Sequence, residues 1–297
     1  MKLITYIYEN KENIGVLNAD ETRVIPLSSL GIDSPSMNDL ISDYTLEALV
    51  NTVSSQLDNL DVNTCSISLA EVTAAPPIPS PRQDIICLGI NYWAHAEESA
   101  RYKKEAFDRD RTYPIYFAKR VNRAVADGEM IDSHRDMFQN LDYESELAVI
   151  IGKPCKNATL DNAKDHIFGY TIVNDMSARE IQTRHKQWYF GKSLDEFTPM
   201  GPCIVTADEI PYPPHLDIKS YVNGELRQNS NTELLINDID YVICELSQGM
   251  TLLPGTIIST GTPAGVGMGF EPPKFLSPGD EVICEIQGIG QLKNKIK

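Results

Sequence analysis

The chain has 297 residues, 42% of them hydrophobic and 23% charged, a composition typical of a globular protein that builds one sizeable core plus a smaller unit. Its formal net charge of −16 argues against nucleic-acid binding, because an acidic surface repels phosphate backbones and no basic stripe interrupts the acidity. No apolar run approaches the roughly 20 residues of a membrane span, and the N-terminus lacks the features of a signal or transit peptide, so we expect a cytoplasmic protein without membrane contact.

Residues 1–72 are predicted to form a small, β-rich N-terminal domain. Alternating apolar and polar residues separated by turn formers predict three strands there. These strands are expected at 3–8, 14–17 and 24–27. A proline-rich stretch over 73–83 then predicts a stiff, extended linker, and residues 84–297 form the expected catalytic domain.

Past residue 84 the pattern predicts mostly strands with a few short helices between them. Apolar, β-branched runs predict buried strands at 85–89, 114–118, 147–151, 170–173 and 256–260. Asn223-Gly224 favours a tight hairpin turn, because both residues accept positive φ. Since strands and helices do not alternate regularly, a Rossmann fold or a barrel is disfavoured, and the predicted class is α+β with much antiparallel or mixed sheet.

A helix is predicted to begin after Asn91 and to carry two residues suited to proton transfer. His95 and Glu98 lie three residues apart on it, so the carboxylate can orient the imidazole or share a water with it. This spacing suggests a general-base dyad, and an exposed helix with an incidental histidine is the alternative. The charged stretch 101–111 that follows is interpreted as a polar segment and a candidate lid.

Two glutamates come directly before a buried strand. In Glu144-Ser145-Glu146 alternate side chains lie on the same face of an extended chain, so the two carboxylates are about 7 Å apart along the backbone. Like charges at the start of a buried strand are costly unless a cation lies between them, and hard divalent cations prefer oxygen ligands. A metal ion is the simplest explanation, and a solvated strand end is the alternative.

Another buried strand is predicted to end on Asp175, followed by a helix. Ser177 and Glu180 match the capping-box pattern, which would start that helix two residues after the aspartate. Arg179 and Gln182 would then share a helix face and point back toward the site. The alternative for Asp175 is a second helix-capping group.

Two glycine-punctuated loops complete the candidate site. The first, over 191–202, offers the cation Lys192, and the second, over 259–269, offers the hydroxyl of Thr262 on a backbone that can approach a ligand closely. Neither matches the glycine spacing of a dinucleotide or phosphate loop. Taken singly, each loop is better explained as structural.

Six cysteines are scattered through the chain without a Cys-x-x-Cys pair or a histidine at zinc-finger spacing. They are interpreted as reduced thiols that serve packing rather than catalysis or metal binding.

All five stretches, in this order, resemble the fumarylacetoacetate hydrolase family, and the resemblance covers essentially everything from Arg82 to the C-terminus. The matching motifs are Gly89-x-Asn91-Tyr92-x-x-His95-x-x-Glu98, Glu144-x-Glu146-Leu147, Asn174-Asp175-Met176-Ser177-Ala178-Arg179, Gly191-Lys192-Ser193 with Gly201-Pro202, and Gly261-Thr262-Pro263. The resemblance is to a longer bacterial form with a small N-terminal domain. It implies a β-rich layered roll and a homodimer.

The resemblance also implies roles for individual residues. Glu144, Glu146 and Asp175 would hold Mg²⁺ or Mn²⁺. His95 and Glu98 would handle a water or a proton from a helix that orders when substrate binds. The substrate would be contacted by Arg179, Gln182, Lys192 and Thr262, with Lys192 also counted as catalytic. One departure from the family pattern is Arg120-Val121-Asn122-Arg123, which we expect near the substrate pocket.

The function predicted from these residues is metal-dependent C–C bond cleavage of a small 2-oxo acid through a metal-stabilised enolate. Oxaloacetate-type decarboxylation and acylpyruvate hydrolysis both fit. The first alternative is an isomerase of unsaturated diacids of the 2-hydroxyhepta-2,4-diene-1,7-dioate type. The second is a non-catalytic, metal-binding regulatory protein, which is disfavoured because metal binding alone does not need His95, Glu98 and Lys192.

Overall fold

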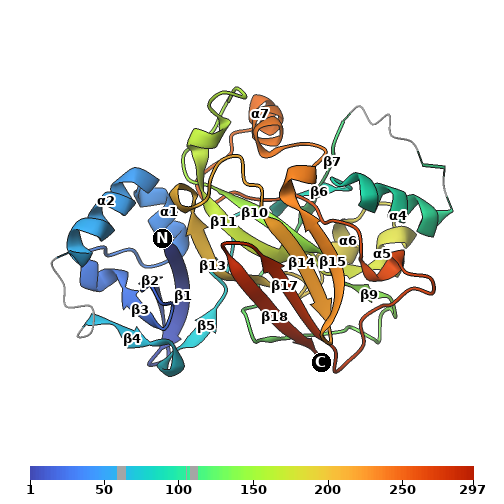
Figure 1. The fold of residues 1–297 in the computed structure, drawn as a ribbon, viewed down its shortest axis with the longest axis horizontal. Coiled ribbons are helices and arrows are strands. Elements are labelled where there is room, and N and C mark those ends of the chain that lie inside the picture. The colour runs from blue at the N-terminus through green and yellow to red at the C-terminus, as the bar shows by residue number, and fades with distance from the viewer. Residues whose placement is uncertain (59–64, 105, 108–112) are drawn as a thin grey trace.

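The computed structural model describes residues 1–58, 65–104, 106–107 and 113–297. In this part of the chain a long mixed sheet runs through the molecule, a five-stranded sheet lies across its middle, and short helices surround both (Figure 1). This arrangement confirms the predicted α+β class with its β-rich layered roll.

The long sheet contains eleven of the described strands. In spatial order they are β4 (Ile67–Ser68), β3 (Arg23–Pro26), β2 (Lys11–Leu17), β1 (Lys2–Tyr8), β13 (Met200–Thr206), β11 (Ile167–Asn174), β10 (Ser145–Ile151), β16 (Ile257–Ser259), β6 (Ile85–Gly89) and β7 (Ile115–Lys119), with β5 (Thr73–Ala75) also on β1. Neighbouring strands are antiparallel, except that β16 and β6 run parallel. The three strands predicted before residue 72 are confirmed as β1, β2 and β3.

The N-terminal unit shares this sheet with the rest of the chain. Strand β1 pairs with β13, placing Leu3 opposite Ile204. The unit also contains two helices that the sequence analysis missed, α1 (Met37–Asp43) and α2 (Leu46–Leu57). Each has a side-chain N-cap, Ser36 and Thr45 respectively, a signal that could have revealed them.

The proline-rich stretch is packed against the body of the protein rather than standing free as a spacer. Residues 73–75 form β5, which pairs with β1 in the long sheet, and the side chain of Ile78 is fully buried. The division into an N-terminal domain, a linker and a catalytic domain stays a prediction.

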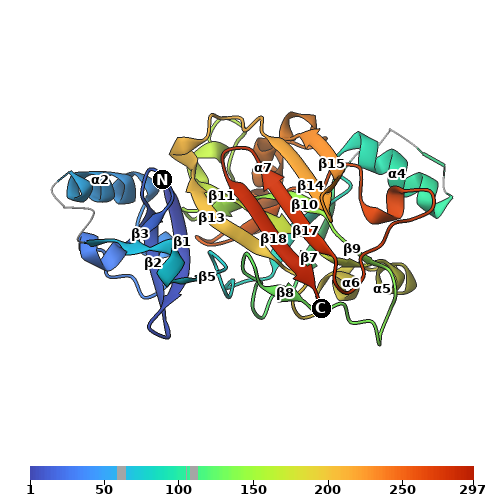
Figure 2. The same ribbon diagram turned by 60° about the horizontal axis from the view of Figure 1, so that its bottom comes forward.

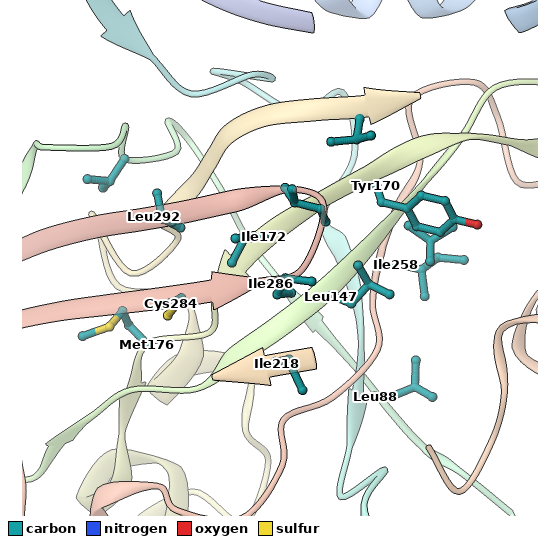
Figure 3. Close-up of a cluster of buried hydrophobic side chains, with 14 of the residues drawn as sticks. Leu88, Leu147, Tyr170, Ile172, Met176, Ile218, Ile258, Cys284, Ile286 and Leu292 are labelled. Atoms are coloured by element: carbon teal, nitrogen blue, oxygen red, sulfur yellow. The ribbon is translucent and has the colours of Figure 1, made fainter. Parts of the chain in front are cut away.

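The smaller sheet covers β10, β11 and β13, as both views of the ribbon show (Figures 1 and 2). Its order is β15 (Glu225–Asn231), β14 (Asp217–Val222), β17 (Glu281–Ile286), β18 (Gly290–Ile296) and β8 (Met130–Ile131). The predicted turn joins β14 to β15, with φ of +51° at Asn223 and +80° at Gly224. Figure 3 shows the side chains that fill the space between the sheets, among them Leu147, Ile172 and Ile286.

Strand β10 is apolar on both faces because both faces are covered. Leu147 and Val149 belong to the core cluster under the smaller sheet, whereas Ala148 and Ile150 belong to a second cluster that includes Leu40 of α1. A strand buried on both sides needs no alternation of apolar and polar residues. Any charged residue at its beginning is therefore carried into the interior.

The helices that follow the N-terminal unit lie at the ends and edges of the sheets. They are α4 (Trp93–Lys103), α5 (Arg179–Arg184), α6 (Tyr189–Lys192) and α7 (Ile239–Gly249). A two-stranded ladder joins β9 (Leu141–Asp142) to β12 (Ser177–Ala178). The 3₁₀ turns are η1 (Leu27–Leu30), η2 (Leu69–Glu71), η3 (Ala163–His166), η4 (Ala207–Glu209), η5 (Thr232–Leu234) and η6 (Gly267–Gly269).

Helices α4, α5 and α6 gather at the end of the molecule opposite the N-terminal unit (Figures 1 and 2). Part of the candidate lid at 101–111 lies outside the described residues, namely 105 and 108–112. In the described ranges, no helix combines the length and the apolar character needed to cross a membrane.

The cysteines agree with the packing interpretation. All six are thiols, and four of them are buried. Burial raises the pKa of Cys203 and of Cys284 to about 12, so these thiols stay protonated at neutral pH.

Because β1 and β13 pair in one sheet, we expect a substitution that removes packing at their contact to destabilise the whole chain. Leu3 is fully buried there, and Leu3→Ala should lower the free energy of unfolding by about 2–5 kcal/mol. Urea denaturation followed by circular dichroism and by fluorescence of Trp93 and Trp188 measures this. Leu160→Ala, at a side chain 58% exposed, is the control and should change stability by less than about 0.5 kcal/mol. A separate early transition without any change in tryptophan fluorescence would contradict the prediction.

Candidate metal centre

Three buried carboxylates meet where two central strands adjoin. Carboxylate oxygens of Glu144, Glu146 and Asp175 all lie within 4.8 Å of one another. The antiparallel register pairs Ser145 with Asn174, so the beginning of β10 lies against the end of β11. The Asn174 side chain tightens this junction by accepting a hydrogen bond from the Glu144 backbone N–H at 2.9 Å.

Hydrogen bonds within this junction, and from Ser259 and Gly261 outside it, hold the three residues in place. The Asp175 N–H donates to the carbonyl oxygen of Glu144 at 2.8 Å. The carboxylate of Glu146 accepts hydrogen bonds from the Ser259 hydroxyl at 2.6 Å and from the Gly261 N–H at 3.0 Å. The sequence prediction that these three carboxylates converge is therefore matched by the structure, and the alternative of a solvated strand end for the glutamates is wrong.

Three buried cations pack around the carboxylates. Lys192 Nζ lies 2.6 Å from both Glu144 Oε2 and Asp175 Oδ2. Arg179 Nη1 lies 2.7 Å from Glu144 Oε1, and Lys119 Nζ lies 2.8 Å from Asp175 Oδ1. The sequence analysis missed Lys119. The one pattern that could have indicated it is a charged residue at the end of the apolar strand β7.

A fourth carboxylate, Asp142, was also missed. It accepts hydrogen bonds from Arg179 Nε at 2.9 Å and from the N–H groups of Gly267 and Met268 at 2.6 and 3.0 Å. The buried cluster then contains four acids and three bases, namely Asp142, Glu144, Glu146, Asp175, Lys119, Arg179 and Lys192. With every group ionised, it carries one net negative charge.

Glu146 is the carboxylate whose charge is least compensated. Burial and the neighbouring charges of Asp175 and Glu144 raise its pKa well above the ordinary value. Burial acts on Glu144 in the same direction, but there Lys192 and Arg179 outweigh it and hold the pKa of that carboxyl below its usual range. A divalent cation would supply the missing positive charge, and an all-oxygen donor set suits Mg²⁺ or Mn²⁺ without ranking them.

A cleft of about 1100 Å³ opens beside this cluster. The predicted site residues that line it are His95, Glu144, Glu146, Arg179, Gln182, Lys192 and Thr262. Asp175 lies beneath the lining, and Glu98 lies behind His95. The structure thus brings every predicted site residue to one place.

Arg179 lines this cleft and contains one buried donor that the described residues leave without a partner. Its side chain is 4% exposed, and its Nη1 also donates to Gln182 Oε1 at 3.2 Å. Its Nη2 has no hydrogen-bond partner among the described residues. A buried donor without a partner is costly, and Arg179 keeps this cost at a place where its positive charge borders the cleft.

The candidate dyad is buried, so the alternative of an exposed helix with an incidental histidine is wrong. His95 Nδ1 lies 3.1 Å from Glu98 Oε2, and the Gly265 N–H donates to Glu98 Oε1 at 3.0 Å. A side chain at Gly269 would have its Cβ 1.7 Å from Glu98 Oε1. The second glycine loop therefore approaches the dyad closely, and its Thr262 and Met268 also line the cleft.

The predicted capping box is wrong. Helix α5 begins at Arg179, and its N-cap Ala178 makes no side-chain hydrogen bond. Ser177 instead pairs with Asp142 in the β9–β12 ladder, and its hydroxyl donates to the carbonyl oxygen of Asp175 at 2.9 Å. Tertiary pairing therefore overrides the local capping pattern.

The segment 120–123 does not line the cleft itself, although Phe117 of the preceding strand and Lys192 do. Its polar groups bond elsewhere: the Arg120 N–H donates to the Ser193 hydroxyl at 3.0 Å, and Arg123 pairs with Glu129 at 2.8 Å.

Thr262 lines the cleft, but its hydroxyl is already engaged. It donates to the carbonyl oxygen of Ser145 at 2.9 Å and accepts from Gln228 Nε2 at 2.7 Å. The Gln228 side chain also accepts from the Ser145 N–H at 3.1 Å. Gln228, which no sequence motif indicated, thus ties the smaller sheet to the start of β10.

Comparison with known proteins places this site in a family context. Residues 84–297 match the family model described as fumarylacetoacetate (FAA) hydrolase C-terminal. Oxaloacetate tautomerase YisK of Bacillus subtilis is 46% identical over 80% of this chain and 77% of its own length. Fumarylacetoacetate hydrolase from Exiguobacterium antarcticum superposes with a TM-score of 0.83 at 35% identity, covering 100% of this chain and 99% of that one. Maleylpyruvate hydrolase from Sphingobium sp. SYK-6, in complex with manganese(II) and pyruvate, gives 0.77 at 31% identity and covers 100% and 98%.

Glu146 offers the sharpest test of metal binding, because its charge is the least compensated. Glu146→Gln keeps the shape of the side chain but removes that charge, and should weaken Mn²⁺ binding by at least tenfold in isothermal titration calorimetry. Glu180→Gln, a change at the cleft wall outside the cluster, is the matched control and should leave the affinity within about twofold. Equal Mn²⁺ affinity in the wild type and in Glu146→Gln would contradict the assignment.

Proposed function

The chain belongs to the fumarylacetoacetate hydrolase family, and from that premise we propose that it forms the enolate of a small 2-oxo acid of the oxaloacetate or acylpyruvate type. The proposed cofactor is Mg²⁺ or Mn²⁺, held by Glu144, Glu146 and Asp175. The reaction classes that fit are those in which an enolate is reprotonated or in which a C–C bond is cleaved.

The proposal rests on the net negative charge of the buried cluster. Four carboxylates against three cations leave one negative charge, so a divalent cation would reverse the sign of the site. A 2-oxo acid, which brings one carboxylate, would then restore neutrality. When bound, the cation supplies Lewis-acid polarisation of the substrate's carboxylate and 2-oxo oxygens. The Sphingobium relative, whose structure contains manganese(II) and pyruvate, supports a pairing of this kind.

Arg179 and Lys192 bind and stabilise negative charge in this scheme. Arg179 lines the cleft and supplies positive charge beside the substrate carboxylate, while its Nε and Nη1 stay with Asp142 and Glu144. Burial disfavours the charged form of Lys192, but Asp175 and Glu144 outweigh burial and raise its pKa, so the ammonium persists. A fixed cation beside the 2-oxo oxygen stabilises the negative charge that develops there.

His95 and Glu98 move the proton. Because Nδ1 of His95 faces Glu98, Nε2 is the nitrogen left to take a proton from the carbon next to the 2-oxo group. Glu98 is held by the glycine loop, so it keeps the imidazole in one orientation. In tautomerisation His95 then delivers this proton to the enolate oxygen. In hydrolysis the neutral imidazole instead takes its proton from a water that attacks a second carbonyl.

The way in which the enolate forms separates the candidate reactions. Removal of a proton from carbon and its delivery to the enolate oxygen gives tautomerisation, which the name of the Bacillus relative favours. Attack of water on a second carbonyl, followed by scission of the C–C bond, releases a carboxylic acid and the enolate as the leaving group, and the name of the Sphingobium neighbour favours this hydrolysis. Loss of carbon dioxide from the keto form of oxaloacetate also leaves an enolate, which is then protonated. An isomerase of unsaturated diacids would begin, like tautomerisation, with removal of a proton from carbon, whereas a purely regulatory protein would not need the His95–Glu98 contact.

Turnover with defined substrates tests this function. Metal-stripped protein should be inactive, and added Mg²⁺ or Mn²⁺ should restore conversion of oxaloacetate or of a simple acylpyruvate. Ultraviolet absorbance follows loss of the enol, and carbon dioxide release identifies decarboxylation. Glu144→Ala should abolish the restored activity, whereas Glu180→Ala should retain it. Metal binding without conversion of either substrate would contradict the proposed function.

The close approach of the glycine loop to Glu98 yields a second prediction. Gly269→Ala places a methyl group on the Glu98 carboxylate and should lower kcat by roughly 10- to 100-fold through misplacement of His95. Gly249→Ala, where a Cβ meets open space, is the matched control and should leave kcat unchanged. Adding Glu98→Asp to Gly269→Ala shortens the clashing side chain and should recover part of kcat. Full activity of Gly269→Ala would contradict a positioning role for the loop.

A further inference from the structure

The start of β10 carries two of the carboxylates, but the neighbouring strand on one side ends before it. The ladder of β16 against β10 reaches back only to Ala148, which pairs with Ser259. Ser145, which lies between Glu144 and Glu146, is beyond the end of that ladder and is fully buried. A buried peptide group without a partner is costly, so whatever bonds to Ser145 fixes the chain at this point.

Two side chains occupy the position that a longer strand would have at Ser145. The carboxamide oxygen of Gln228 accepts from the Ser145 N–H at 3.1 Å, and the Thr262 hydroxyl donates to the Ser145 carbonyl oxygen at 2.9 Å. The carboxamide nitrogen of Gln228 donates to the Thr262 hydroxyl and to the carbonyl oxygen of Pro263, both at 2.7 Å. Gln228 is fully buried, and its carboxamide joins all the members of this closed set of hydrogen bonds.

This set of hydrogen bonds acts on both glutamates through the backbone of Ser145. Glu144 and Glu146 are its two neighbours in the chain, and their carboxylate oxygens lie within 4.8 Å of one another. The loop that carries Thr262 also donates to the Glu146 carboxylate, from the Gly261 N–H at 3.0 Å. A small shift of Ser145 would therefore change the spacing of two oxygen ligands at once, and metal affinity depends on the groups that hold the ligands in place.

We propose that Gln228 is a positioning residue for the metal centre. From outside the carboxylate cluster, its carboxamide sets the distance between Glu144 and Glu146 and thereby the affinity for a divalent cation. Gln228 belongs to β15, so the smaller sheet controls how tightly the long sheet binds the ion. This inference rests on the metal assignment within the proposed function, because it takes both glutamates as ligands.

Calorimetric titration of two matched variants with Mn²⁺ separates positioning from general stability. Gln228→Met keeps the length of the side chain but leaves the Ser145 N–H without its partner, and should weaken Mn²⁺ binding by roughly 10- to 100-fold. Asn294→Leu removes another buried carboxamide of the same sheet, one that donates to the carbonyl oxygens of Ala126 and Glu129 at 2.8 and 2.9 Å. It should lower the melting temperature of the chelator-treated protein as Gln228→Met does, yet keep the Mn²⁺ affinity within about twofold.

Thr262→Val is a milder second variant, which removes the hydroxyl and keeps the shape of the side chain. It should weaken Mn²⁺ binding by roughly three- to tenfold, and it keeps the test decisive if Gln228→Met does not fold. In the double variant, the loss of affinity should be smaller than the product of the two single losses, because both side chains hold the same backbone segment.

Unchanged Mn²⁺ affinity in Gln228→Met or in Thr262→Val would overturn the positioning role, and so would an equal loss in Asn294→Leu. These outcomes are separate from failure of the metal assignment. If the wild type binds no Mn²⁺, or Glu146→Gln binds it as tightly as the wild type, the assignment itself fails. Binding that is weakened in Glu146→Gln but intact in Gln228→Met removes the role of Gln228 alone.

Discussion

Buried carboxylates that crowd together are the constraint on which the rest of this structure depends. Removing a carboxylate from water costs several kcal/mol unless partners replace its hydration, and like charges nearby add to that cost. Lys119, Arg179 and Lys192 offset three of the four negative charges. The remaining negative charge is least compensated at Glu146, and it is the physical reason to expect a divalent cation at this site.

The fold supplies this arrangement through strand pairing rather than through one local motif. The register of β10 against β11 brings the start of one strand to the end of the other, and each face of the pair is covered by its own apolar cluster. Residues 261–269 then approach so closely that their N–H groups bond to Glu146, Glu98 and Asp142. One glycine-rich loop thereby fixes both the carboxylate cluster and the dyad.

Much of this site could be predicted from the sequence, for reasons tied to particular residues. Alternation before a fully apolar strand indicated Glu144 and Glu146, and helical spacing indicated the contact between His95 and Glu98 that the structure contains. Asp142 and Lys119 could not be found this way, because their importance arises from contacts between segments distant in the chain. The capping box failed for the same reason, since strand pairing engages its serine. In the N-terminal unit, the strands followed from alternation, whereas α1 and α2 were missed despite their capping residues.

The central claim is that this buried cluster, once charged with a divalent cation, enolises a 2-oxo acid. Exchange of the C3 protons of 2-oxobutyrate for deuterium, followed by proton NMR in D₂O, measures that step without any cleavage of a C–C bond. The account predicts enzyme-dependent exchange that requires Mg²⁺ and is lost in Glu146→Gln. Exchange that is absent in the Mg²⁺-bound wild type, or undiminished in Glu146→Gln, would contradict it.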